Sequence, residues 1–244
     1  MKTFAAHGVY GTCAITAVTA QNTVGVSLFE TLSPRLVRAQ IDAVATDIGV
    51  DAAKTGMLAT AAIVDAVVDA VSDLQIRNLI VDPVMIAKSG ATLLDDEAVR
   101  AIRLNLLRRA AAVTPNIPEA EALSGMRIEN DGHRREAARR IADLGARAVI
   151  VKGGHLPGDE IVDLLYDGSH FTEFRNRRVP GRHTHGTGCT FAASLAASLA
   201  LGLSLAEAVP IAQSYIAGAI DAAPDLGRGH GHGPMDHFWQ TRRS

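Results

Sequence analysis

Apolar positions along this chain follow two spacings, and each spacing predicts a different kind of element. Unbroken apolar runs are typical of strands that are buried on both faces of a parallel sheet. Such runs occur at 78–82, 111–114 and 147–152, and each one ends in a polar residue. We therefore expect three buried strands whose last residues leave the core at one edge of a sheet.

Apolar residues three and four positions apart predict helices beside these strands. Ser33 followed by Pro34 is a helix-start signal, and Thr60 opens a second helix. The apolar faces expected of these two helices comprise Leu36, Val37, Ile41 and Val44 in the first, and Ile63, Val64, Val67, Val68 and Val71 in the second. Further helices are expected at 95–109, 134–144, 187–201 and 204–223.

The order of these elements predicts the fold class. Short strands that alternate with helices indicate βαβ units, hence an α/β fold with a mostly parallel central sheet. Residues 161–166 and 171–174 predict an antiparallel hairpin across Asp167-Gly168. No linker or internal repeat divides the chain, so we expect a single domain over residues 1–244. In such sheets ligands bind at the carboxyl ends of the strands.

Composition narrows the classes of partner. Of the 244 residues, 48% are hydrophobic, the formal net charge is −2 and aromatic residues make up 4%. A chain without a basic stripe or stacking aromatics is not expected to bind nucleic acid, and no stretch is apolar for long enough to cross a membrane. The two cysteines, Cys13 and Cys189, suggest no disulfide framework, which is typical of a reducing cytoplasm.

One segment combines features of an anion site. The turn Gly186-Thr187-Gly188 runs directly into the helix expected at 187–201, and Cys189 lies in the first turn of that helix. Free N–H groups at a helix start bind phosphate, and the same field favours the thiolate of a cysteine placed there. A plain glycine turn is the alternative, so further parts of a phosphate site are needed.

Those parts follow the three buried strands. Asp82, the pair Asn116 and Glu119, and Lys152 each come after one of the runs. Carboxylate and amide oxygens suit a hydrated Mg²⁺, and a strand-end lysine reaches phosphates. The alternatives are a helix cap for Asn116 and Glu119 and a solvated lysine. Taken together, polar clusters at successive strand ends favour phosphoryl transfer; further members of these clusters are Lys88-Ser89-Gly90 and His155.

Ordered motifs throughout the chain resemble a known family. They are Thr16-Ala-Val-Thr-Ala-Gln21-Asn22-Thr23, Lys54-Thr-Gly56-Met57-Leu58, Asp82-Pro-Val-Met85-Ile-Ala-Lys88-Ser-Gly90, Thr114-Pro-Asn116-Ile-Pro-Glu119, Lys152-Gly-Gly-His155, His185-Gly-Thr-Gly-Cys189-Thr and Gly229-His-Gly-His-Gly233-Pro234. This series resembles the hydroxymethylpyrimidine/phosphomethylpyrimidine kinase branch of the ribokinase-like superfamily, which acts in thiamine biosynthesis.

The resemblance implies a three-layer α/β/α fold, ATP with Mg²⁺, and two successive phosphorylations of hydroxymethylpyrimidine. Gln21 matches the residue that binds the aminopyrimidine edge, and Met57 and Val84 match the apolar walls of that pocket. The turn at 186–188 matches the anion hole. Cys189 matches the position of the catalytic base in other superfamily members, or it only contacts the substrate.

On the nucleotide side, the resemblance implies that Asp82 and Glu119 organise Mg²⁺ and the phosphates. Asn116, Lys152 and Thr187 match positions that contact the nucleotide. The family also leads us to expect a cytoplasmic homodimer.

The chain departs from the family pattern at its first residues. Family members carry a strand and a Gly-rich loop before the segment that matches 1–4, so either the given start is misplaced or trimmed, or the protein is shortened and its fold is without that strand and loop. A catalytically silent ligand-binding protein is therefore one alternative, and a pyridoxal kinase on the same scaffold is another. A metal site at His230, His232 and His237 is a weaker alternative, because a third ligand is not evident for the closely spaced pair.

Overall fold

The computed structural model describes residues 1–85, 94–154, 158–224 and 229–241, and a six-stranded sheet lies at its centre. The strands lie in the order in which they occur in the chain, so each βα unit adds one strand to the same edge. The first four strands are parallel, and the last two complete the sheet as an antiparallel hairpin. They are β3 (Ala53–Thr55), β4 (Leu79–Val81), β5 (Ala112–Val113), β6 (Val149–Val151), β7 (Glu160–Tyr166) and β8 (Phe171–Arg177).

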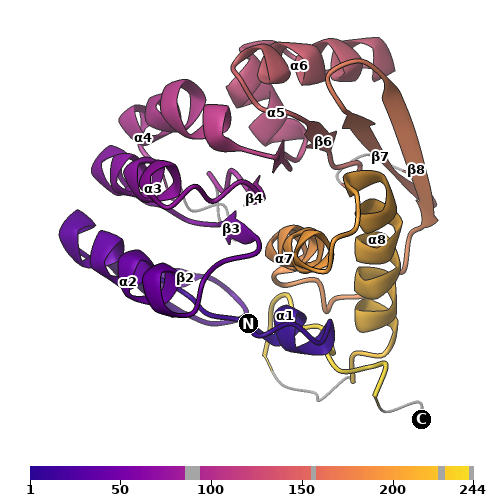
Figure 1. The fold of residues 1–244 in the computed structure, drawn as a ribbon. Helices are drawn as coiled ribbons and strands as arrows, with labels where there is room; N and C mark the ends of the chain where they lie inside the picture. Colours follow the sequence, from indigo (N-terminus) through magenta and orange to yellow (C-terminus); the bar gives the residue numbers. More distant parts are fainter. Residues whose placement is uncertain (86–93, 155–157, 225–228, 242–244) are drawn as a thin grey trace.

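Helices cover both faces of this sheet and make the three layers seen in Figure 1. One face carries α2 (Pro34–Asp47), α3 (Ala61–Asp73), α4 (Asp96–Ala101), α5 (Ile117–Ser124) and α6 (Asp131–Asp143). The other carries α7 (Thr187–Ala200) and α8 (Leu205–Asp221), with the short helix α1 (Lys2–Ala6) against α7. The mostly parallel three-layer fold expected from the sequence is confirmed.

The apolar runs are continuous because both faces of the sheet are buried. In β4, Leu79 and Val81 join the core beneath α3, whereas Ile80 between them packs against α7 with Phe191 and Leu195. Successive side chains of a strand point to opposite faces, so each layer of helices receives alternate residues. The two hydrophobic cores lie on the two sides of the sheet as a result.

The predicted helices form, with one error in a buried face. Ser33 and Thr60 cap α2 and α3, and each side-chain oxygen accepts a hydrogen bond of 3.3 Å from a backbone N–H three residues on. Leu36, however, was expected in the core and is 49% exposed. The orientation of α2 on the sheet fully buries Val37 and leaves the neighbouring Leu36 toward solvent. The segment expected as one helix at 95–109 is helical from residue 96 onward. It begins as the α-helix α4 and continues as a π turn at 102–106 and a 3₁₀ turn at 107–109.

Four elements were not expected from the sequence: α1, β3, and the hairpin of β1 (Ala17–Gln21) and β2 (Val26–Thr31). The hairpin lies outside the main sheet and most of its residues are exposed or half-buried, so no alternation of polar and apolar positions marks it. Its turn does carry a readable signal, since the side chain of Asn22 accepts hydrogen bonds from the backbone N–H groups of Val24 and Gly25.

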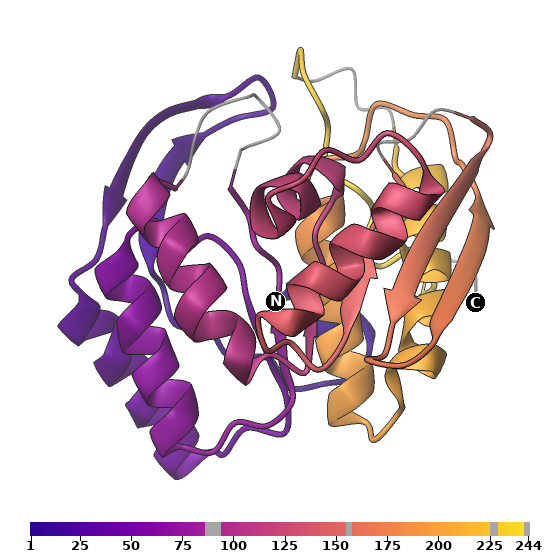
Figure 2. The ribbon, with the colours of Figure 1, turned by 90° about the horizontal axis from the view of Figure 1, so that it is seen from above.

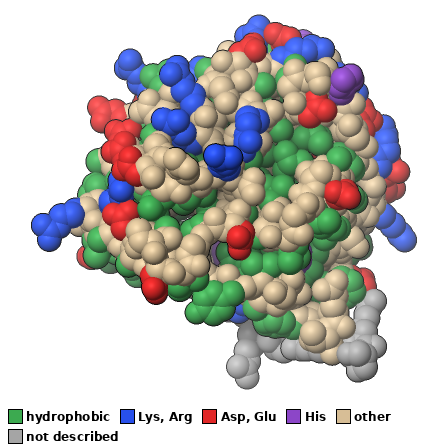
Figure 3. All heavy atoms as spheres, viewed as in Figure 1, with side chains coloured by type: hydrophobic (Ala, Val, Ile, Leu, Met, Phe, Trp, Pro, Cys, Tyr) green, Lys and Arg blue, Asp and Glu red, His purple; other side chains and the backbone are tan. Residues whose placement is uncertain are grey.

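Basic side chains gather over α4 and α6 on the face shown in Figure 3. On α6 they are interleaved with acids, because Arg135 pairs with Asp131 at 2.8 Å and Arg140 pairs with Glu136 at 3.1 Å. These pairs neutralise much of the positive charge of that helix locally. None of the helices within the described ranges has the length and apolar character needed to cross a bilayer.

The packing of α1 and the C-terminal segment on α8 depends on two neutral histidines, which predicts a pH dependence of stability. His7 lies 2.7 Å from the Ser194 hydroxyl and packs edge-on against Tyr215, whose hydroxyl donates to the carbonyl of His237. Burial lowers the pKa of both histidines. The unfolded chain therefore binds protons at a higher pH than the folded protein does.

This stability should be fully present above pH about 6.5 and should be lost as the pH falls through the lower folded-state pKa values. We therefore expect the stability that the wild type gains over a His7→Gln/His237→Gln variant, measured as the difference of their melting temperatures, to shrink between pH 8 and pH 5. Melting temperatures followed by circular dichroism would check this, and parallel curves for the two proteins would contradict it.

Candidate active site

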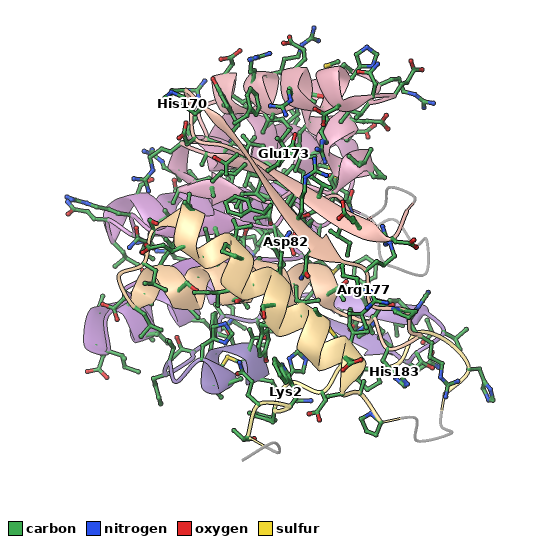
Figure 4. The ribbon with its side chains drawn as sticks, turned by 90° about the vertical axis from the view of Figure 1, so that its right-hand side faces the viewer. Lys2, Asp82, His170, Glu173, Arg177 and His183 are labelled. Carbon is green, nitrogen blue, oxygen red and sulfur yellow. The ribbon has the colours of Figure 1, made fainter. Side chains whose placement is uncertain are left out.

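The polar strand ends predicted from the sequence meet at one edge of the sheet. Asp82 follows β4 and Lys152 follows β6, and both strands point the same way. Figure 4 shows Asp82 between the sheet and the α7–α8 layer, with Arg177 and His183 toward the same side and His170 at the opposite end of β8. This edge is the one at which ligands bind in open α/β sheets.

A lysine between two acids forms the centre of this edge. The ammonium Nζ of Lys152 lies 3.1 Å from Oδ1 of Asp82 and 3.9 Å from Oε2 of Glu119. Asp82 is only 2% exposed. Burial by itself would lower the pKa of Lys152, but the charges of Asp82 and Glu119 outweigh it, and the pKa is raised. The lysine is therefore a fixed positive charge at neutral pH.

Glu119 is the acid whose protonation is most altered. Burial raises its pKa to about 7, and the charge of Asp82 adds to the rise while Lys152 opposes it. A carboxyl that titrates near neutrality at a strand-end cluster is typical of a functional site. Its charge state will respond strongly to any cation that binds beside it.

Asn116 and Glu119 form the capping box that the sequence left open as an alternative. The side chain of Asn116 accepts from the Glu119 N–H at 2.9 Å, and Oε2 of Glu119 accepts from the Asn116 N–H at 2.8 Å. Glu119 thus caps α5 and faces Lys152 with the same oxygen. Oδ1 of Asn116 already accepts the capping hydrogen bond. If this side chain contacts the nucleotide, its NH₂ group is therefore the donor.

The start of α7 points at this cluster. Gly186 has φ +79°, a conformation that glycine adopts readily, and no side chain caps the helix after it. A Cβ built on Gly188 would lie 3.4 Å from Nζ of Lys152 and 3.9 Å from Oδ2 of Asp82. The uncapped N–H groups of residues 187–189 and the ammonium of Lys152 therefore converge, as an anion site requires.

Cys189 occupies the expected place, but its expected thiolate character is wrong. Its side chain keeps access to solvent on one side, while protein atoms surround most of the thiol. Burial raises the pKa of Cys189, and the charge of Asp82 raises it further, whereas Lys54 and Lys152 oppose the rise. Because its pKa is raised, the thiol is protonated at neutral pH.

Lys54 is a site residue that the sequence reasoning missed. It lies opposite Ile80 in the β3–β4 register, and Ile80 packs against α7. Side chains directly opposite in a sheet share a face, so Lys54 also faces α7, where its charge acts on Cys189. Lys54 stands in one of the motifs that carry the family resemblance, but the strand that positions it, β3, was not expected from the sequence.

The acids fit a magnesium ion. Oδ2 of Asp82 is buried and accepts no well-formed hydrogen bond from the described residues. Mg²⁺ in nucleotide sites takes one or two carboxylates and completes its shell with water and phosphate oxygens. Asp82 and Glu119 supply that number of carboxylates beside the anion site. Within the described ranges, no cluster of three or more His, Cys, Asp or Glu residues could hold a metal by itself.

The residues expected to bind the pyrimidine lie on three separate segments at the same edge. Gln21 ends β1 and is exposed, Met57 follows β3, and Val84 follows Asp82; the last two are half-buried. Figure 2 shows the β1–β2 hairpin (indigo) and the segment from residue 229 (yellow) at one edge of the molecule.

Two contacts attach that hairpin to the site. The Thr16 hydroxyl donates to the carbonyl of Met57 at 2.7 Å, and the N–H of Gly231 donates to the Thr23 hydroxyl at 3.4 Å. The same glycine-rich segment then pairs with the chain just before α7, where the His185 N–H donates to the Gly233 carbonyl. Gln21 is thereby held on the side of the sheet at which α7 begins.

Some sequence-predicted residues fall elsewhere. Lys88, Ser89, Gly90 and His155 lie outside the described residues. His232 lies 3.2 Å from the Thr184 hydroxyl, and His237 packs against α8 near Tyr215. These histidines therefore take part in the packing of the C-terminal segment.

Known proteins resemble this chain over nearly its whole length. Residues 1–236 match the family described as phosphomethylpyrimidine kinase. A hydroxymethylpyrimidine/phosphomethylpyrimidine kinase of Bacillus subtilis is 47% identical over 100% of this chain and 90% of its own. The crystal structure of a phosphomethylpyrimidine kinase from Clostridium difficile is 39% identical, covers 90% of each chain and superposes with a TM-score of 0.80. A pyridoxal kinase from Staphylococcus aureus, in complex with AMP-PCP, is 35% identical with a TM-score of 0.89, over 99% of this chain and 87% of its own.

Proposed function

The chain belongs to the phosphomethylpyrimidine kinase family, a family of phosphotransferases, and we propose that it phosphorylates 4-amino-5-hydroxymethyl-2-methylpyrimidine and then the resulting monophosphate with ATP. The diphosphate formed in this way serves thiamine biosynthesis. The observation that carries the proposal is the ion pair of Lys152 and Asp82 directly in front of the uncapped start of α7.

In this proposal the residues act mainly by position and charge. Lys152 and the N–H groups of residues 187–189 hold the phosphoryl group during transfer, because charge spreads over its oxygens in a loose transition state. Cys189 contacts the hydroxymethyl oxygen and, in its thiolate form, takes the proton of that hydroxyl. Asp82 and Glu119 would hold Mg²⁺, which would neutralise phosphate charge when ATP is bound. Asn116 and Thr187 contact the nucleotide.

ADP release with Mg-ATP tests the proposal directly. Hydroxymethylpyrimidine, its monophosphate and pyridoxal would be offered separately to the 244-residue chain. Turnover on both pyrimidines is the expected result. Silence on all three substrates, with intact binding of the pyrimidine, would favour a silent ligand-binding protein instead.

A pyridoxal kinase is the second candidate, because the pyridoxal kinase from Staphylococcus aureus superposes closely on this chain. The greater identity to the curated pyrimidine kinase and the presence of Gln21 and Met57 favour the aminopyrimidine. Turnover on pyridoxal alone in the same assay would reverse this order.

We further propose a single kinase domain that works in the cytoplasm as a homodimer. Two free cysteines suit a reducing compartment. On the β1–β2 hairpin, Val18 is 61% exposed and Leu28 is 63% exposed, so this element offers apolar surface to a second copy. Sedimentation of the purified chain would give the oligomeric state.

Replacing Gln21 with alanine should weaken pyrimidine binding. The substrate's polar edge would lose a hydrogen-bonding partner, a loss worth about 1–3 kcal/mol, so the KM for hydroxymethylpyrimidine should rise about 5- to 150-fold while the KM for ATP stays constant. Steady-state kinetics with each substrate varied in turn would measure this. An unchanged pyrimidine KM would show that Gln21 is misassigned.

A further inference from the structure

A third buried acid lies beside Lys152 and is not used by the chemistry described above. Asp163 of β7 is 4% exposed. Val151 pairs with Leu164 in the antiparallel β6–β7 register, so the next residues, Lys152 and Asp163, also stand side by side. Oδ1 of Asp163 accepts a hydrogen bond of 2.7 Å from the N–H of Gly153, the residue that follows the lysine.

The other oxygen of Asp163 is held from a different layer of the fold. Nε2 of Gln213, on α8, donates to Oδ2 of Asp163 at 2.8 Å and to the carbonyl of Phe174 in β8 at 3.1 Å. Both carboxylate oxygens are therefore occupied. Two hydrogen bonds to fixed donors leave the side chain a single orientation, and that orientation determines where the N–H of Gly153 lies.

The opposite side of the same turn is fixed by close backbone packing. A Cβ built on Gly153 would lie 2.2 Å from the carbonyl oxygen of Val162, so only glycine fits. That carbonyl accepts a hydrogen bond of 2.7 Å from Nη1 of the buried Arg134 on α6. The backbone after Lys152 is thus held from both helical layers, by α8 through Asp163 and by α6 through Val162.

We propose that Asp163, oriented by Gln213, is a positioning residue that fixes the Lys152-Gly153 backbone and thereby aims the lysine ammonium at Asp82 and the transferred phosphoryl group. A lysine side chain is long and rotatable, so the placement of its charge depends on how firmly its backbone is anchored. The inference rests on the proposed function in one respect, since its effect on turnover can be measured only if the protein is a kinase. It does not require Asp163 to touch substrate.

Asp163→Asn and Gln213→Leu test the proposal, with Ser194→Ala as the matched control. An asparagine keeps the acceptor for Gly153 but turns an NH₂ group toward the NH₂ of Gln213, so the orienting contact is lost. Gln213→Leu removes the same contact and leaves Asp163 intact. Ser194→Ala removes a buried hydrogen bond to His7 on the far side of α7, and therefore reports the cost of such a loss away from Lys152.

We expect kcat to fall about 10- to 100-fold in Asp163→Asn and in the same direction in Gln213→Leu, with the pyrimidine KM unchanged, because small displacements of a catalytic charge cost this much. The dissociation constant of AMP-PCP, measured by calorimetry, should rise in both variants and not in Ser194→Ala. Melting temperatures of all three would be measured beside the kinetics.

Two results would overturn the inference. Both variants could lose melting temperature as Ser194→Ala does and keep wild-type kcat and AMP-PCP affinity, which would make Asp163 a structural residue only. Alternatively, kcat could hold while only the pyrimidine KM rises. A wild-type protein that releases no ADP would instead count against the proposed function, and AMP-PCP affinity would then decide the role of Asp163 by itself.

Discussion

Replacing Lys152 with methionine should reduce turnover by about 10³-fold and also destabilise the fold. Lys152 pairs with both Asp82 and Glu119. Removing one member of a buried ion pair leaves an uncompensated charge, which costs about 3–5 kcal/mol of unfolding free energy. Steady-state kinetics and urea unfolding of the same preparation would measure the two effects.

A second substitution separates the two effects of Lys152→Met. In the double variant Lys152→Met/Asp82→Asn the buried negative charge is removed together with its partner, so much of the lost stability should return. Turnover should stay low, because neither the ammonium nor the carboxylate is restored. Recovery of turnover along with stability would mean that Lys152 acts on folding and not on the phosphoryl group.

Replacing Cys189 with alanine should lower kcat by about 10²- to 10⁴-fold, the usual contribution of a positioned proton acceptor. ATP affinity should change little, because the backbone N–H groups at the start of α7 remain. Turnover assays and AMP-PCP calorimetry on the variant would check both statements. Turnover equal to that of the wild type would remove Cys189 from the mechanism.

The raised pKa of Cys189 sharpens this prediction. The thiolate is the form that accepts a proton, and burial holds the thiol protonated to a pH above its usual pKa of about 8.5. The kcat/KM of the wild type, which reports the free enzyme, should therefore keep rising with pH beyond that value. The Cys189→Ala variant should lack this rise, whereas a rise that persists in the variant would assign it to another group.

Local sequence rules succeeded where neighbouring residues decide the outcome. The helix caps at Ser33 and Thr60 are confirmed. The capping box of Asn116 and Glu119, which was the alternative to a nucleotide or metal role, also forms. Each of these hydrogen bonds joins residues three apart in the chain. The polar ends of the buried strands met at one edge because parallel strands align their carboxyl ends. The hairpin of β1 and β2 was missed, since an exposed hairpin needs no apolar alternation.

The amino-acid pattern by itself determined the mostly parallel α/β class and the edge that carries Asp82, Glu119, Lys152 and the start of α7, whereas the three layers were implied by the resemblance to the family. The class and the edge follow from apolar period, caps and glycine turns, which are short-range properties of the chain. The tertiary structure alone decided the charge states, above all the protonated thiol of Cys189. It also brought Asp163 and Gln213 to the turn after Lys152, from positions 10 and 60 residues beyond Gly153. Hydration and Coulomb forces depend on what packs around a group in space, and that information is spread over the whole chain.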